Sequence, residues 1–175
     1  MRIVKAFLSI FMFLMTANCN AEITGTVVDA ETGKPIEGAV VLVEWTITKG
    51  LPGMSYSELK KVVEVETSGN GKFIVSGEYN SLTGHTTVLI YKAGFVAWRN
   101  DFIFPGWKKR ASFPYHAGSL FKLEKFKETY SHKEHKDFIE YGIMGLYKLP
   151  INELPKVRMG IEFEKSLIQQ NHKNK

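Results

Sequence analysis

The chain has 175 residues, of which 44% are hydrophobic and 23% charged. This composition is typical of a folded globular protein, and it excludes a collagen-like chain, a coiled coil and a disordered chain. A formal net charge of +5 and a pI near 9.2 favour anionic surfaces only slightly, and they fall short of the charge expected of a nucleic-acid-binding protein.

The amino terminus has the pattern of a signal peptide. A basic start over residues 1–5 precedes a ten-residue apolar run, residues 6–15, that only Ser9 interrupts. This run is too short to cross a bilayer, which requires about 20 apolar residues. We therefore expect export and removal of residues 1–21, with cleavage after Ala21.

The single cysteine, Cys19, lies where a bacterial lipoprotein signal places its lipidated thiol. Asn18 departs from the small residue that such signals carry before the cysteine, which favours cleavage after Ala21. The mature chain would then contain no cysteine, and its stability would come from its core rather than from disulfides. The alternative is an outer-membrane lipoprotein anchored through Cys19. Either way the expected location is the periplasm or the cell envelope.

Residues 22 to about 126 alternate between apolar and polar side chains or form short apolar runs between glycine-bearing turns. This pattern predicts an all-β fold. We expect about seven strands: 23–28, 39–48, 62–67, a strand beginning near Phe73, 86–92, 95–102 and 119–124. Asn70-Gly71 supplies the positive backbone angles of a tight type I′ turn, so we expect a hairpin at this position.

One segment matches a longer pattern. Residues 25–41 read G-x-V-x-D-x-x-T-G-x-P-I-x-G-A-x-V, and later elements are Thr67 to Gly71 with Phe73, and Ala93-Gly94-Phe95. On these motifs, residues 22–124 resemble the carboxypeptidase regulatory-like domain family. The resemblance implies a seven-stranded transthyretin-like β-sandwich, with the chain as a free-standing exported bacterial member of the family.

The matched positions have architectural explanations. Asp29 and Thr32 can bond the backbone of a turn, Gly33 can adopt a left-handed conformation, and Pro35 fixes the return of the chain. Gly38-Ala39 allows close packing of neighbouring segments. The motif therefore indicates a fold and not a reaction.

Beyond residue 125 the pattern becomes helical. Ser131 and Glu134 have the spacing of a capping box. The apolar face of the first predicted helix, which Pro150 ends, comprises Phe138, Ile139, Tyr141, Ile143, Met144 and Tyr147. A second helix is predicted over 155–169, weakened by Gly160, with Val157, Ile161, Leu167 and Ile168 facing inward. We expect both helices to dock on the sandwich, the alternative being a partner-binding element.

The chain therefore divides into a signal peptide (1–21), a β-sandwich domain (22–125) and a helical extension (126–175). His132 and His135 are the only weak candidates for metal ligands, because their three-residue spacing differs from the His-Glu-x-x-His pattern of zinc peptidases. No G-x-S-x-G motif or phosphate-binding loop is present, and the expected mature chain contains no cysteine nucleophile. We expect no enzyme, no metal and no cofactor.

A candidate ligand-binding loop carries Trp107 beside Lys108, Lys109 and Arg110. The indole could stack on a sugar while the cations hold phosphate or carboxylate groups. The alternative is that Trp107 folds over an open end of the sandwich.

The function expected from the sequence is that of a non-enzymatic exported binding or structural accessory of the bacterial cell envelope. One alternative is a module that binds anionic glycans through the Trp107 loop, and another is an auxiliary regulatory subunit of a separate peptidase. The expected partner is an unidentified envelope protein or glycan. Nucleic acid is not expected, since the leader predicts export, and the sequence does not define an oligomeric state.

Overall fold

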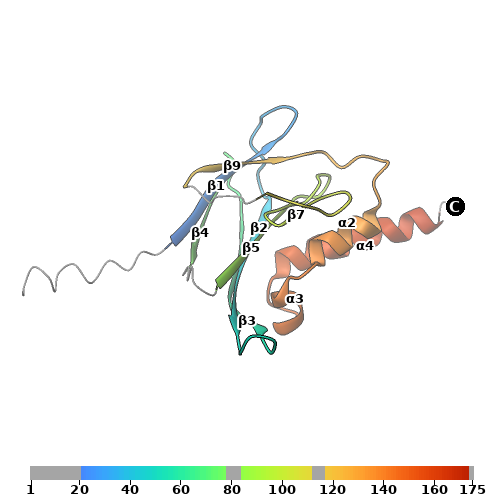
Figure 1. Cartoon of the computed structure of the whole chain (residues 1–175). Coiled ribbons are helices and arrows are strands. Elements are labelled where there is room, and N and C mark those ends of the chain that lie inside the picture. Colours follow the sequence, from blue (N-terminus) through green and yellow to red (C-terminus); the bar gives the residue numbers. More distant parts are fainter. Residues whose placement is uncertain (1–20, 78–83, 112–116, 174–175) are drawn as a thin grey trace, which may run out of the picture.

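A computed structural model describes residues 21–77, 84–111 and 117–173. Within these residues the chain is mainly β, with nine strands and a carboxy-terminal segment of three helices (Figure 1). This confirms the predicted mainly β fold with helices at its end. The expected number of seven strands is wrong for the described part, where three of the strands have only two residues each.

Two sheets contain the long strands. A three-stranded sheet has the order β4-β1-β9, and its members are β1 (Ala21–Asp29), β4 (Lys72–Gly77) and β9 (Ser119–Leu123). A four-stranded antiparallel sheet has the order β3-β2-β5-β6, and its members are β2 (Val40–Lys49), β3 (Tyr56–Glu66), β5 (Gly84–Tyr91) and β6 (Trp98–Arg99). A small ribbon pairs β7 (Phe102–Ile103) with β8 (Lys108–Lys109).

The first hydrophobic core contains alternate residues of both large sheets. The three-stranded sheet contributes Ile23, Val27, Phe73, Val75, Phe121 and Leu123, and the four-stranded sheet contributes Val41, Val43, Trp45, Val88 and Ile90. Within the three-stranded sheet, Gly25 of β1 lies close to β9. An added Cβ at Gly25 would lie within 2.8 Å of the Ser119 carbonyl oxygen and overlap the Phe121 ring. The alternation in sequence therefore places one face of each sheet in a common core.

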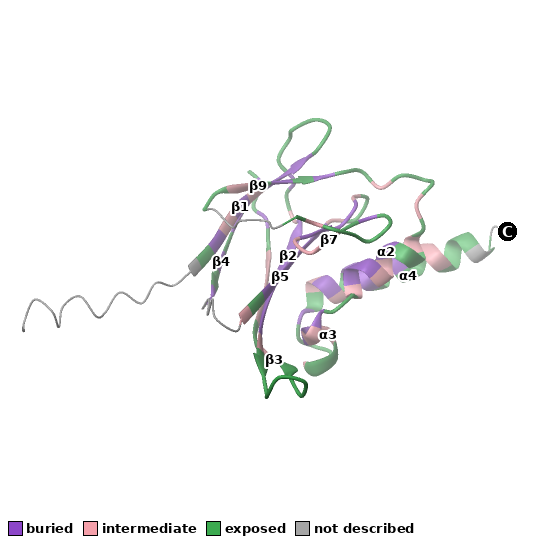
Figure 2. Cartoon of the chain, viewed as in Figure 1, coloured by how far each residue is buried: buried purple, intermediate pink, exposed green. Residues whose placement is uncertain are grey.

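A second core lies on the opposite face of the four-stranded sheet. Here the helices α2 (His132–Glu140), α3 (Met144–Lys148) and α4 (Pro155–Lys173) pack on the sheet (Figure 1). The core residues from the sheet are Val40, Leu42, Leu89 and Tyr91, and those from the helical segment include Phe138, Ile139, Ile143, Val157 and Ile161. Residues 40–46 of β2 are consequently buried without interruption, as Figure 2 shows along the middle of the molecule.

The turn roles predicted from the family-like motif are confirmed. Oδ1 of Asp29 accepts the N–H groups of Glu31 at 2.8 Å and Thr32 at 3.0 Å, and Gly33 has a φ of 70°. Pro35 returns the chain to β1 through a bridge with Val28. The motif therefore shapes the turn from which the chain crosses to the other sheet.

The predicted hairpin at Asn70-Gly71 is wrong, although the turn itself forms. Gly71 has a φ of 74°, but β3 before the turn pairs with β2, and β4 after it pairs with β1 in the other sheet. Thr67 explains the crossing, because its buried hydroxyl donates to the carbonyl of Ile36 at 2.6 Å and accepts the N–H of Ala39 at 2.8 Å. These bonds hold the chain where it leaves the four-stranded sheet.

The strand predicted over 95–102 is also wrong, since only β6 and the start of β7 form there. At this point Asn100 bonds β5 through its side chain as well as through its backbone N–H, which donates to the carbonyl of Val88 at 3.2 Å. Its Oδ1 accepts the N–H of Val88 at 2.8 Å, and its Nδ2 donates to the carbonyl of Thr86 at 2.8 Å. These bonds occupy backbone groups of β5 with which a longer strand would otherwise pair.

The helix predicted between Ser131 and Pro150 is in fact two helices, because the chain breaks at Gly142, whose φ is 66°. Ser131 Oγ accepts the N–H of Glu134 at 3.3 Å, which confirms the predicted cap. The break turns Tyr141 and Tyr147 outward, so their predicted place on the buried face is wrong.

The second predicted helix is confirmed as α4, which extends to Lys173. Val157 and Ile161 are buried as predicted, whereas Leu167 and Ile168 are half-buried. Gly160 lies against the ring of Tyr91, and an added Cβ there would be 2.5 Å from Cε1. The glycine that weakens the helix is therefore what allows α4 to approach the sheet.

Gly160→Ala is expected to lower the free energy of unfolding by about 1–3 kcal/mol, because a methyl group does not fit beside the buried Tyr91. This loss should exceed the gain of about 1 kcal/mol in helix propensity. Urea unfolding measures the difference. Ser166→Ala, at an exposed position of the same helix, should change stability by less than about 0.5 kcal/mol. A Gly160→Ala variant as stable as the parent would show that α4 does not pack this closely.

Candidate functional site

The helical segment is fixed to the sheet by polar side chains of the strands. Glu64, on β3, accepts the N–H groups of Lys156 at 3.0 Å and Val157 at 3.1 Å in the first turn of α4. A helix start leaves such N–H groups without partners inside the helix. Glu64 therefore caps α4 from a strand about ninety residues away in sequence.

Glu44 plays a similar part at the start of α3. Its carboxylate is almost fully buried, and its two oxygens accept the N–H groups of Met144 at 3.0 Å and Gly145 at 2.7 Å. Burial raises the pKa of Glu44 above its ordinary value, and these two hydrogen bonds only partly oppose the effect.

Arg99 closes the end of α2. Its buried guanidinium donates to the carbonyl oxygens of Phe138 at 3.2 Å and Tyr141 at 2.7 Å, and it forms a paired interaction with Asp101 at 2.8 and 2.7 Å. The carbonyls at a helix end lack partners inside the helix. Arg99 therefore joins the sheet to the turn after α2, and Asp101 balances its charge.

Glu164, on α4, lies at the centre of a buried cluster. Tyr91 Oη donates to its Oε1 at 3.1 Å, and His132 Nδ1 lies 2.7 Å from its Oε2. His135 Nδ1 lies 3.2 Å from Oε1 but is not aligned for a hydrogen bond. Burial raises the pKa of Glu164, but the His135 and His132 imidazoles lower it more, and the result lies below the ordinary value.

The two histidines of this cluster are the weak metal candidates of the sequence. The structure brings both to Glu164, but Nε2 of His135 accepts the N–H of Ala97 at 2.8 Å. The proton of neutral His135 must therefore be on Nδ1, which leaves neither ring nitrogen free for a metal. Within the described parts of the chain, no group of three His, Cys, Asp or Glu side chains is arranged as metal ligands.

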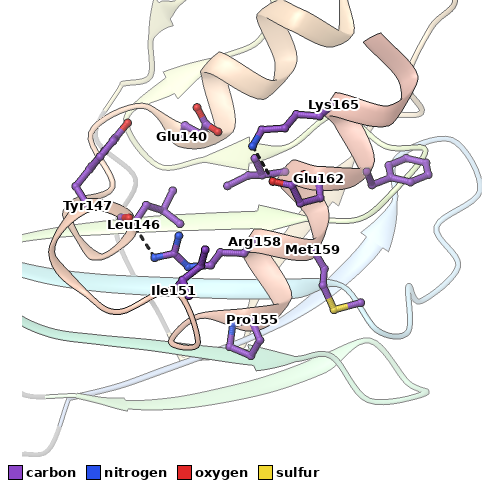
Figure 3. A pocket seen from close by; sticks show the side chains of 11 residues that line it. Glu140, Leu146, Tyr147, Ile151, Pro155, Arg158, Met159, Glu162 and Lys165 are labelled. Atoms are coloured by element: carbon purple, nitrogen blue, oxygen red, sulfur yellow. Dashed lines mark hydrogen bonds and ion pairs between the residues drawn. The ribbon is translucent and has the colours of Figure 1, made fainter. Parts of the chain in front are cut away.

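The cluster and the caps position a cavity of about 740 Å³ on the outer side of the helices (Figure 3). Its lining comprises Glu140, Leu146, Tyr147, Ile151, Pro155, Arg158, Met159, Ile161, Glu162, Phe163 and Lys165. Tyr147, Ile151 and Met159 are each more than 70% exposed. We call this cavity the helical pocket.

The charged side chains of the helical pocket have partners within the chain. Arg158 donates to the carbonyl of Leu146 at 3.1 Å, and Lys165 pairs with Glu162 at 2.7 Å (Figure 3). Glu140 pairs with Lys136 at 2.9 Å. The pocket therefore presents an apolar surface on which Glu140, Glu162 and Lys165 are ion-paired, whereas Arg158 bonds only backbone carbonyl oxygens among the described residues.

Sequence patterns missed this pocket. Met159 and Phe163 are four residues apart in α4, and this spacing placed them on one helix face. That face is opposite the buried face formed by Val157 and Ile161. A second apolar face on the same helix was the sequence pattern that could have predicted the pocket.

The structure separates the residues of the predicted binding loop. Trp107 packs on Phe138 and Tyr141, with ring centroids 5.2 and 5.0 Å away, and remains 36% exposed. Arg110 turns inward and donates to the carbonyl of Arg99 at 2.8 Å.

Lys108 and Lys109 are exposed on β8. Only two of the three predicted cations therefore face solvent, and glycan binding by this loop stays a prediction. Cys19 and residues 1–20 of the predicted signal peptide lie outside the described residues.

Comparisons with known proteins add little. No family model and no curated protein matches the chain. The carboxypeptidase regulatory-like resemblance therefore rests on its motifs. Among solved structures, a streptococcal ancillary pilin is 18% identical with a TM-score of 0.34. The alignment covers 62% of this chain and 30% of the pilin chain. None of the described helices has the length and apolar character needed to cross a membrane.

Glu164→Gln is expected to lower the free energy of unfolding near neutral pH by about 1.5–3 kcal/mol, because an amide is a weaker acceptor than a carboxylate. The substitution should also reduce the loss in the free energy of unfolding as the pH falls into the acid range. Since the pKa of Glu164 in the folded protein is below the ordinary 4.5, its stabilisation is complete above that value and is lost as pH falls through the lowered pKa.

Urea unfolding over a series of pH values measures both effects. Glu162→Gln is the matched control, because Glu162 is exposed on the same helix and pairs only with Lys165 in the described structure. An acid slope that persists unchanged in the Glu164→Gln variant would contradict this role.

Proposed function

We propose that the protein is an exported, non-catalytic accessory of the bacterial cell envelope, built on a transthyretin-like β-sandwich, which binds a partner protein through the helical pocket. The observation that carries the proposal is the helical pocket itself: its apolar lining remains exposed although the same helices bury their opposite faces. Gathered apolar side chains rimmed by polar ones are typical of interaction sites.

The chemistry of the partner follows from the charges around the pocket. Arg158, Glu162, Lys165 and Glu140 already have partners within the chain. A cationic ligand would lose its hydration and find no unpaired carboxylate in the described lining, and an anionic ligand would find only Arg158, whose guanidinium already donates to three backbone carbonyl oxygens. The best-matched occupant is therefore an uncharged apolar segment of another protein, with aromatic or aliphatic side chains that fill the cavity.

The non-catalytic part of the proposal is supported by what the buried ionisable groups do. Glu44, Arg99, His135 and Glu164 each bond the helical segment to the sheet. Docking of the helices on the sheet therefore explains why these ionisable groups are buried, and no catalytic role is needed to explain it. The role of an auxiliary peptidase subunit rests on the family resemblance alone.

A photo-crosslinking residue at Tyr147, in the wall of the pocket, is expected to form an adduct in native envelopes. Mass spectrometry of the crosslinked peptide should identify an uncharged apolar segment of another envelope protein. Replacing Met159 and Phe163 by Glu should reduce the adduct by about tenfold or more, since two carboxylates in an apolar contact cost several kcal/mol.

The matched control is the same crosslinker at Leu120, an exposed apolar residue on the three-stranded sheet. It should not give this adduct. An adduct with a second copy of this chain, with a highly charged peptide, or with nothing at all would overturn the proposed binding mode.

A further inference from the structure

A second hollow, of about 360 Å³, lies on the same outer face of the four-stranded sheet as the helices. Along this face the pair Leu42 and Leu89 is covered by the helices. The next pairs on the same face are Glu44 with Thr87 and Thr46 with His85. The face therefore changes from apolar to polar where the helical cover ends, and we call this site the polar hollow.

The turn after α2 and the neighbouring strands complete the walls. The lining comprises Glu44, Thr46, Ser57, His85, Thr87, Arg99, Asp101, Tyr141, Gly142 and Met144. Arg99 and Asp101 neutralise each other, and Arg99 also bonds two carbonyl oxygens. His85 is the one basic side chain of the described lining without a carboxylate partner.

Hydroxyl groups remain available. Thr87 is buried, and its side chain forms no hydrogen bond with a described residue. Ser57 and Tyr141 contribute two more hydroxyls, and Thr46 has only a long contact of 3.5 Å with the carbonyl of His85. Each hydroxyl both donates and accepts, and the Glu44 carboxylate keeps lone pairs beyond the two that bind backbone N–H groups.

An aromatic surface stands beside these groups. Tyr141 is 51% exposed, and both Trp107 and Phe102 pack edge-on with its ring, with centroids 5.0 and 5.6 Å away. The Arg99 guanidinium also lies over this ring, with Cζ 5.8 Å from the centroid. These contacts hold the Tyr141 ring in place. The exposed part of the Tyr141 ring beside several hydroxyls matches a molecule with hydroxyls at its edge and C–H groups on its face.

We infer that the polar hollow binds a neutral sugar unit, which hydrogen-bonds with Thr87 and Glu44 and packs on Tyr141. The volume is at the low end of the range of about 300–1,000 Å³ for ligand pockets, which suits a single sugar ring. This site differs from the helical pocket, so it adds a small-molecule ligand to the protein partner proposed above. It also differs from the cationic loop, because Lys108 and Lys109 take no part in it.

The test is NMR titration of the full mature chain with glucose, galactose and N-acetylglucosamine, with glucosamine and glucose 1-phosphate as cationic and anionic probes. At least one neutral sugar should shift the amide signals of Glu44, Thr87 and Tyr141. Thr87→Val should weaken this binding by about tenfold, since it removes one hydrogen-bonding group from a buried site.

Thr86→Val is the matched control. Thr86 is the adjacent residue, faces the core between the sheets, and has a buried hydroxyl with no partner among the described residues. Its replacement should leave sugar binding unchanged, as should neutralisation of both Lys108 and Lys109 by Gln. The spectrum of each free variant reports whether it is folded.

Three outcomes would overturn the inference: no shift with any neutral sugar, binding of only the charged probes, or equal loss of binding in the Thr86 and Thr87 variants. Loss on neutralising Lys108 and Lys109 would instead assign the sugar to the loop. None of these outcomes affects the helical pocket, so the two proposals fail separately.

Discussion

The structure depends on the burial of β2 and β5 from both sides. One face of these strands packs on the three-stranded sheet and the other on α2 and α4. An apolar sheet face left in water would cost roughly 25 cal/mol for each Å² of exposed apolar surface, so the four-stranded sheet requires its helical cover. The cover in turn places helix ends over a sheet, where their backbone groups need partners. Glu44, Glu64 and Arg99 supply these partners from the strands.

This arrangement explains what could be predicted from the sequence. The turn around Asp29 and Gly33 was predictable, because its hydrogen bonds join residues close in sequence. The start of α2 was predictable from its Ser131 cap and α4 from its apolar period, whereas the break at Gly142 that separates α2 from α3 was not. The pairing partners of β3 and β4 were not, because a turn such as Asn70-Gly71 fixes the local backbone angles but not the sheet to which each strand belongs.

The candidate sites were less predictable than the fold. The helical pocket depends on the break at Gly142, which turns Tyr147 outward, and no periodicity reports such a break. The polar hollow depends on the register of β2 against β5, which aligns Glu44 with Thr87 over more than forty residues of sequence. The polar hollow lies where the helical segment meets the sheet, and the helical pocket lies on the side of the helices that faces away from the sheet. The extension is thus a structural cover, and it also contributes to the lining of both proposed binding sites.

The central claim is that the sheets and the helices form one cooperative unit. Native-state hydrogen exchange of the mature chain tests it most directly. The account predicts that the buried amides of Phe138 and Val157 exchange with the same opening free energy as those of Leu42 and Leu89 in the strands, because the helices cannot leave without exposing the sheet. Helix amides that open at a cost lower by about 2 kcal/mol or more, while the strands stay protected, would contradict it.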